Sequence, residues 1–176
     1  AYVPGGTSGR NTNQQLATSL NKKGIYSIVR HPLYLGNFFI FLGPFIFAGN
    51  IYGVIIFILI FWIYYERIMF AEEIFLMNKF DDEFQEWSLK TPAFIPNPSL
   101  YLRNNDKFSI RKVLVREYSG ICGVILIFTI LLAYRNYSFN VIPILSNNWK
   151  ALFIISTLLY ISIRTYKKIR LSKKYY

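Results

Sequence analysis

Residues 34–65 read YLGNFFIFLGPFIFAGNIYGVIIFILIFWIYY and contain no charged side chain. The segment holds two apolar runs, 34–48 and 51–65, with a two-residue turn between them. A bilayer core about 30 Å thick needs roughly 20 largely apolar residues per helix, so each run is shorter than an ideal span. The pattern predicts a tight helical hairpin with a break at Gly43-Pro44, where neighbouring helices can bury the freed backbone groups.

Two more apolar runs follow the hairpin, at 119–134 and 149–163. The chain is 53% hydrophobic and 19% aromatic, an excess that must face lipid or a partner. The predicted fold class is therefore all-α, as a multi-pass transmembrane helical protein. The alternative is a basic soluble protein with buried helices, which is disfavoured because charges stand only at the ends of the four runs.

The formal net charge of +11 is distributed unevenly along the chain. With four spans, the amino terminus, the 66–118 connection and the carboxyl-terminal tail lie on one side of the membrane. That side carries eighteen Lys and Arg residues, and only Arg135 and Lys150 fall on the other side. By the positive-inside rule the basic segments are cytoplasmic, so the charge indicates membrane topology and not a nucleic-acid partner.

The predicted organisation has two parts. Residues 1–118 form a core with a cytoplasmic amino-terminal loop, the hairpin 34–65, a cytoplasmic segment 66–98 and a connector. Residues 119–176 form two further transmembrane helices and a basic cytoplasmic tail. The chain opens at Ala1 without methionine, which would fit a trimmed product whose upstream helices are missing.

Cysteine and histidine usage argues against a metal site. The single cysteine, Cys122, lies inside the third apolar run, where it is expected to be a small packed hydrophobe. His31 is the only histidine. One histidine without cysteine partners cannot build a usual zinc centre, so no metal is predicted.

The densest polar cluster, residues 24–36 (GIYSIVRHPLYLG), leads directly into the hairpin. Pro32 favours the start of a helix, so Arg30 and His31 lie at a helix amino terminus, which attracts carboxylates and phosphates. Taken singly, Arg30 is an ordinary positive-inside anchor, Tyr34 an interfacial aromatic and His31 a satisfied interfacial residue.

A second cluster, Glu66-Arg67 followed by Glu72-Glu73, stands where the second run ends. Adjacent acids on a helix point about 100° apart, so at most one of Glu72 and Glu73 is expected to face a pocket squarely. Because the hairpin returns this segment to the surface where it began, the two clusters must lie close together. Arginine, histidine and carboxylates can hold a zwitterionic amino-acid head group while aromatics face a sulfonium, which outlines a cofactor site.

These motifs resemble those of the membrane methyltransferases, which include isoprenylcysteine carboxyl methyltransferase and the phospholipid N-methyltransferases. The resemblance covers about residues 22–98 and rests on 24–36, on Glu72-Glu73-Ile74-Phe75-Leu76, on Phe80 and Phe84, and on Pro92-Ala93-Phe94-Ile95-Pro96. It implies S-adenosylmethionine at the cytoplasmic end of the hairpin and a lipid substrate that arrives laterally from the bilayer. The partners implied are a membrane lipid and the bilayer itself.

The resemblance also implies residue roles. The cofactor-binding residues would be His31, Pro32, Leu33, Tyr34, Phe39, Gly43, Pro44 and Glu72. The catalytic residues would be Arg30, Arg67 and Glu73. Two positions depart from the family: Asp81 stands where a glycine is common, and Ile68 stands where an arginine often precedes the acidic pair.

Two other functions remain open from the sequence. Membrane sterol reductases carry a similar Arg-His-Pro-x-Tyr-x-Gly segment and use NADPH, but they are much longer. A non-catalytic membrane module with the same fold is the other reading. The Glu72-Glu73 pair and the Phe-Ile-Pro exit favour methyl transfer, and the acceptor could be a lipid amine, phosphate or carboxylate.

Overall fold

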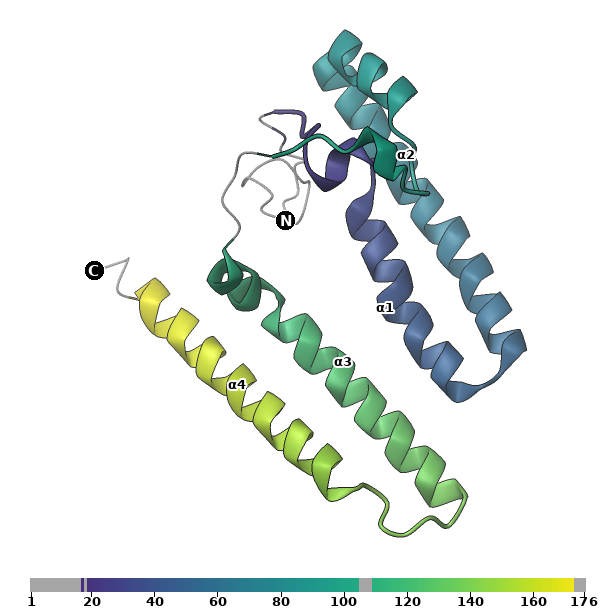
Figure 1. Ribbon diagram of the computed structural model, residues 1–176, viewed down its shortest axis with the longest axis vertical. Coiled ribbons are helices and arrows are strands. Elements are labelled where there is room, and N and C mark those ends of the chain that lie inside the picture. The colour runs from purple at the N-terminus through teal and green to yellow at the C-terminus, as the bar shows by residue number, and fades with distance from the viewer. Residues whose placement is uncertain (1–16, 18, 105–108, 173–176) are drawn as a thin grey trace. The chain divides into compact units, whose positions relative to one another are not determined.

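The computed structural model describes Ala17, residues 19–104 and residues 109–172 (Figure 1). Within this part of the chain the regular structure is helical, apart from one isolated β-bridge between Gly24 and Leu102. The helices are η1 (Ile25–Ser27), α1 (Pro32–Ala48), α2 (Ile51–Lys90), η2 (Pro98–Leu100), α3 (Ile110–Ser138) and α4 (Asn147–Ser172). The all-α prediction is confirmed for the described residues.

The chain divides into two compact units, residues 1–108 and 109–176. The first holds α1 and α2, and the second holds α3 and α4. Most of the amino-terminal loop predicted at 1–23 lies outside the described residues. In the second unit α3 already begins at Ile110, so its first turns occupy part of the predicted connector.

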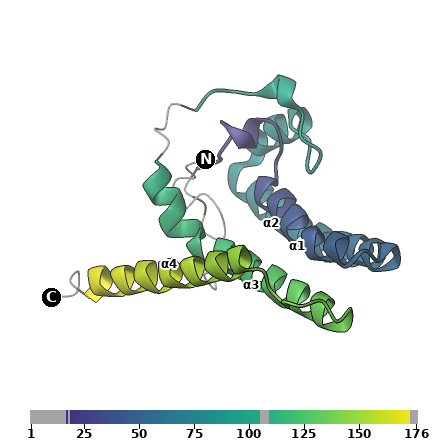
Figure 2. The same cartoon turned by 60° about the horizontal axis from the view of Figure 1, so that its bottom comes forward.

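The predicted hairpin is present as α1 and α2, which lie side by side in both ribbon views (Figures 1 and 2). Gly49 ends α1 with a φ of 71°, a left-handed conformation that glycine adopts without a side-chain clash. The Asn50 side chain then accepts hydrogen bonds from the backbone N–H groups of Tyr52 and Gly53 and so caps α2. The turn is therefore as short as predicted.

The predicted break at Gly43-Pro44 is wrong, because α1 continues through Pro44 to Ala48. Pro44 lies near the carboxyl end of the helix. Pro44 removes one backbone N–H donor from the helix. The disturbance is tolerated because only about one turn of helix follows Pro44.

Aromatic rings hold the two helices of the hairpin together. Phe38 of α1 lies with its ring centroid 5.1 Å from that of Phe61 on α2, and Phe45 lies 4.8 Å from Phe57. Phe61 in turn stacks on Tyr65 at 4.0 Å. This seam brings the start of α1 next to the middle of α2.

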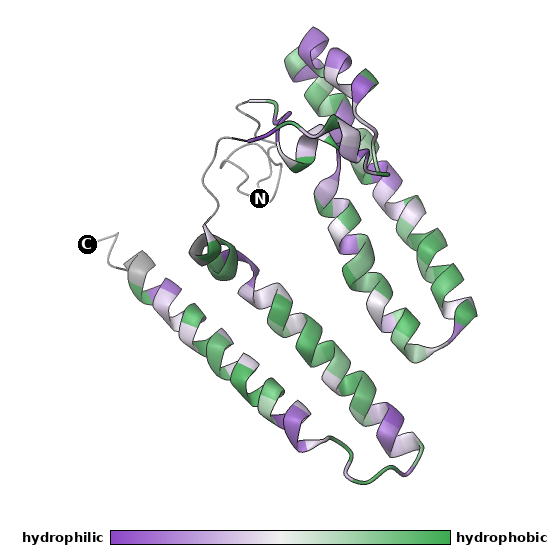
Figure 3. Cartoon of the chain, in the orientation of Figure 1, coloured by the Kyte–Doolittle hydropathy of each residue, from purple (hydrophilic) through white to green (hydrophobic). Residues whose placement is uncertain are grey.

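α2 is 40 residues long and changes character along its length (Figure 3). Its first half is apolar and its second half is charged, as predicted for a span that continues beyond the membrane. Asp81 interrupts the helix with φ 38° and ψ −116°, a conformation that suits glycine. A glycine would adopt this backbone geometry without a side-chain clash.

Two of the described helices, α2 and the Val113–Ser138 part of α3, are long and apolar enough to cross a bilayer. Their most apolar windows are only 11% and 6% buried, so most of that surface requires an apolar environment outside the chain. α1 is apolar, but its 17 residues are fewer than the roughly 20 of an ideal span. In α4 thirteen uncharged residues separate Lys150 from Arg164, fewer than the roughly 20 that an ideal span needs.

The second unit is an antiparallel pair, α3 and α4, joined by small polar side chains. Its buried described residues are Thr129 and Ser156. Trp149 Nε1–H of α4 donates to Thr129 Oγ1 at 3.0 Å, and Cys122 Sγ–H donates to the Ser156 carbonyl at 3.3 Å. Small polar residues at the interface are typical of helices that pack within a membrane.

Candidate functional site

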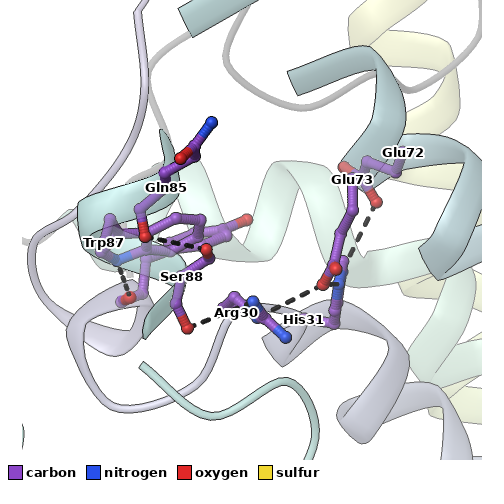
Figure 4. Close-up of polar contacts among 8 residues, drawn as sticks. Arg30, His31, Glu72, Glu73, Gln85, Trp87 and Ser88 are labelled. Atoms are coloured by element: carbon purple, nitrogen blue, oxygen red, sulfur yellow. Dashed lines mark hydrogen bonds and ion pairs between the residues drawn. The ribbon is translucent and has the colours of Figure 1, made fainter. Parts of the chain in front are cut away.

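Polar side chains from two helices meet at the charged end of the α1–α2 hairpin (Figure 4). Arg30 and His31 immediately precede α1, and His31 is its N-cap residue. Glu72 and Glu73 lie on α2, beyond its apolar half. The short turn at the other end of the hairpin sets the register that brings these four side chains together.

His31 lies between the two carboxylates. Its Nε2 is 2.8 Å from Glu73 Oε1, and its Nδ1 is 3.6 Å from Glu72 Oε2. The expectation that only one acid would face the pocket is wrong. Glu72 and Glu73 leave α2 in different directions, but the two ring nitrogens of His31 also point in different directions, so each nitrogen lies near one carboxylate.

The same contacts set the charge of the cluster. Burial lowers the pKa of His31, but hydrogen bonds and charge interactions with Glu72 and Glu73 outweigh burial, so this pKa is raised above its ordinary value. Burial raises the pKa of Glu72, but the hydrogen bonds from His31 and Tyr34 and the charge of His31 lower it overall. Both pKa shifts favour the ion pair between a protonated His31 and an ionised Glu72.

Tyr34 joins the cluster from the first turn of α1. Its hydroxyl donates to Glu72 Oε2 at 2.8 Å, and its ring stacks on His31 with centroids 5.5 Å apart. The centroid of the Tyr65 ring on α2 lies 5.3 Å from the centroid of the Tyr34 ring. The Glu72 carboxylate is thus contacted by both Tyr34 and His31.

Arg30 contacts the cluster and also leaves one donor unused. Its Nε lies 3.2 Å from Glu73 Oε1, and its Nη1 donates to the Ser88 carbonyl at 3.3 Å. The Nε–H is buried and has no acceptor with hydrogen-bond geometry among the described residues. A buried guanidinium donor of this kind is costly unless an acceptor is supplied.

A backbone strap, residues 92–97, fixes the residues just before α1. The N–H of Arg30 donates to the Pro92 carbonyl at 2.9 Å, and the N–H of His31 donates to the Ala93 carbonyl at 3.2 Å. The N–H of Asn97 donates to the Ile28 carbonyl at 2.9 Å. The strap therefore fixes the backbone that carries Arg30 and His31, although it follows α2 in the sequence.

The cluster faces a small, partly open hollow of about 30 Å³. The lining residues are Ser19, Leu20, Asn21, Tyr26, Arg30, His31, Glu72, Glu73, Leu76, Phe84 and Trp87. Tyr26, Leu76, Phe84 and Trp87 were not assigned to the site from the sequence. Phe84 belongs to the motifs that carry the family resemblance, and Tyr26 lies within the polar cluster 24–36. Membership in these motifs could have indicated both residues as site candidates.

Several residues assigned from the sequence do not line this hollow. Phe39 is 62% exposed on α1, and Gly43 and Pro44 lie about 18 Å or more along the helix from His31 at 1.5 Å per residue. Pro32 and Leu33 start α1 next to the cluster. Arg67 is exposed, and its position five residues before Glu72 turns it about 140° around α2.

Among the described residues there is no group of three or more His, Cys, Asp or Glu side chains arranged to hold a metal ion.

Comparison with known proteins adds a family match. Residues 6–83 match the sequence model of the phospholipid methyltransferase family. A protein-S-isoprenylcysteine O-methyltransferase of Schizosaccharomyces pombe is 35% identical over 89 residues, which is 51% of this chain and 36% of that protein. A second enzyme of that name, from Saccharomyces cerevisiae, is 35% identical over 77 residues, which is 44% of this chain and 32% of that protein.

A cobalt-zinc-cadmium resistance protein of Cupriavidus metallidurans is 38% identical over 94 residues, which is 53% of this chain and 41% of that protein. The chain thus spans about a third to two fifths of the length of these relatives. No solved structure matches. On the family match and the two isoprenylcysteine methyltransferase relatives, residues 6–83 are similar to the phospholipid and isoprenylcysteine methyltransferases.

Proposed function

We propose that this chain transfers a methyl group from S-adenosylmethionine to a lipid-like acceptor at the membrane surface. The observation that carries the proposal is the convergence of Arg30 and His31 with Glu72 and Glu73 at the polar end of an apolar hairpin. This convergence lies inside the segment that matches the phospholipid methyltransferase family.

The donor and acceptor groups of the cluster fit the amino-acid part of S-adenosylmethionine. The guanidinium of Arg30 would hold its carboxylate, and the carboxylate of Glu72 would hold its ammonium group. Tyr26 and Trp87, which line the hollow, offer aromatic faces to a cation. When bound, the cofactor supplies an activated methyl group on a positively charged sulfur.

The chain's own residues would act by positioning and by excluding water. Methyl transfer is an in-line displacement that needs no covalent enzyme intermediate, so alignment of the reactants can supply most of the catalysis. The strap 92–97 holds Arg30 and His31 through the backbone, and Tyr34 holds Glu72. Where the acceptor loses a proton, we assign the carboxylate of Glu73, which lines the hollow, to receive it.

Arg30 also borders a second, more open groove with Ser88, Lys90 and Pro92. Two large apolar side chains of that groove, Leu89 and Ile95, are 87% and 79% exposed. Such a groove would let an apolar chain remain at the membrane while its polar end reaches Arg30. We therefore place the acceptor on this side.

The proposed topology is multi-pass, with the amino-terminal segment and the tail in the cytoplasm. It is supported by the eighteen basic residues that four spans would place on one side against two on the other. Cysteines introduced at Ser8 and Ser172 should resist impermeant reagents in intact cells, and one at Ser146 should react.

The test is to incubate membranes that contain the chain with S-adenosylmethionine labelled in the methyl group and then to separate the lipids. Label should enter a lipid fraction with the unchanged chain and not with Glu72→Gln, while the exposed Glu66→Gln serves as a matched control. Oxidation of NADPH without lipid labelling would instead favour a sterol-type reductase. Absence of both would favour a non-catalytic module.

A further inference from the structure

The two units of the chain differ sharply in charge. Residues 1–108 carry nine Lys and Arg against eight Asp and Glu, whereas residues 109–176 carry eleven against one, Glu117. Nearly all of the net charge of +11 therefore belongs to the second unit. This charge is outside the segment that matches the methyltransferase family.

The basic residues of the second unit gather at one end of the helix pair. They stand in the first turns of α3 and the last turns of α4, which are neighbours because the two helices are antiparallel. By position along the described helices they are Arg111, Lys112, Arg116, Arg164, Lys167, Lys168 and Arg170. Only Arg135 and Lys150 stand at the other end.

Two of these cations, Arg164 and Lys167, contact a pair of tyrosine rings that pack together between α3 and α4. Tyr118 of α3 and Tyr160 of α4 have ring centroids 5.3 Å apart. Lys167 Nζ lies 4.5 Å from the Tyr118 centroid, and Arg164 lies over the Tyr160 ring and donates to its hydroxyl. We call these four residues the basic–aromatic cluster.

The cluster goes beyond what the positive-inside rule requires. That rule needs only an excess of Lys and Arg near a span, whereas here a lysine and an arginine are held in defined positions by rings from two helices. Tyrosine, lysine and arginine are also the side chains that suit the headgroup level of a bilayer, where anionic lipids attract cations.

We propose that the basic–aromatic cluster binds the headgroup of an anionic phospholipid. Lys167 and Arg164 would contact the phosphate, since ammonium and guanidinium groups pair strongly with phosphate oxygens. The surrounding basic residues of α3 and α4 would favour anionic over zwitterionic lipids. The second unit is then a lipid-binding element with its own site, and the inference does not depend on the methyltransferase proposal.

The test uses the whole purified chain in detergent, titrated with phosphatidylglycerol or with phosphatidylcholine of the same acyl chains. The bound lipid is measured by native mass spectrometry. Phosphatidylglycerol should be retained in preference to phosphatidylcholine. The double change Arg164→Gln and Lys167→Gln should weaken phosphatidylglycerol binding by roughly 10- to 30-fold, since each cation near the surface contributes about one fivefold factor.

The matched control is Arg135→Gln with Lys150→Gln, which removes the same charge from the other end of the same helices. It should leave phosphatidylglycerol binding unchanged. Tyr118→Leu keeps every charge but removes the ring under Lys167, and it should weaken binding by a smaller factor. Equal loss in both double variants, or equal retention of the two lipids by the unchanged chain, would overturn the proposal. Circular dichroism checks that each variant keeps its helices.

Discussion

The two helix pairs use their polar residues in opposite ways. In the first unit nearly balanced charges converge on a few contacts, with His31 between two carboxylates and Arg30 beside them. In the second unit the cations are almost uncompensated, and along α3 and α4 all but Arg135 and Lys150 lie at one end. The comparison indicates that the first unit gathers opposite charges into a compact cluster, whereas the second presents a charged surface.

The units also differ in how they are packed. The first has a capped end with fully buried side chains, Val29 at 0% and Phe84 at 1% exposed. Among the described residues of the second, the buried ones are the small polar Thr129 and Ser156. We therefore expect the first unit to depend on its apolar core and the second on its interhelical hydrogen bonds and on lipid.

The largest difference should appear at Phe84. Phe84→Ala empties a fully buried position, and changes of this kind typically cost about 3–5 kcal/mol. The thermal unfolding midpoint of the purified chain should fall, and the segment 19–104 should become sensitive to protease. Phe139→Ala in the second unit, where the ring is 75% exposed, should have little effect. Similar losses in both variants would contradict the proposed difference in packing.

A second difference is pH dependence. Burial lowers the pKa of His31, but Glu72 and Glu73 raise it overall, so protonation stabilises the folded first unit. This contribution is fully present below the unfolded pKa of about 6.5 and is lost as the pH rises through the higher folded pKa. We expect the unfolding midpoint to decrease over that alkaline window and the His31→Gln variant to lose this dependence. An unchanged pH profile in the variant would show that His31 is not the titrating group.

A smaller effect is expected at Asp81, where the left-handed backbone is unfavourable for a residue with a side chain. Asp81→Gly should raise the free energy of unfolding by about 1 kcal/mol, since such strain costs 1–3 kcal/mol and glycine loses some of the gain through chain entropy. Asp82→Gly, one residue later in regular helix, should instead lower it. Chemical denaturation of the pair gives the sign, and destabilisation by both changes would contradict the strain.

The smallest effect concerns the second unit. Thr129→Val removes the acceptor of the Trp149 indole N–H, and interhelical hydrogen bonds within membranes contribute about 0.6 kcal/mol on average. Thr157→Val is the matched control, because the Thr157 hydroxyl bonds only within α4, to the Phe153 carbonyl. Unfolding in mixed micelles should separate the two variants. A larger loss in Thr157→Val would argue that α3 and α4 are not joined at Thr129.

The sequence predicted the hairpin, the continuation of α2 beyond the apolar run and the meeting of the two polar clusters. These follow from periodicity and from the short turn, both of which are local. The strap 92–97 could not be predicted, because its hydrogen bonds to Arg30 and His31 use backbone atoms and leave no side-chain pattern. The positions of Glu72 and Glu73 were misjudged, since the 100° rule describes where side chains leave the helix and not where their ends meet a partner such as His31.

The central claim is that Arg30, His31 and Glu72 hold one zwitterionic cofactor, and calorimetric titration with S-adenosylmethionine tests it most directly. A hydrogen bond to a charged group contributes about 1.5–3 kcal/mol, so His31→Ala and Glu72→Gln should each weaken binding roughly ten- to hundredfold. Glu66→Gln, an exposed carboxylate earlier on α2, should bind as tightly as the unchanged chain. If His31→Ala and Glu72→Gln also bind as tightly while retaining their helices, the cofactor does not occupy this cluster.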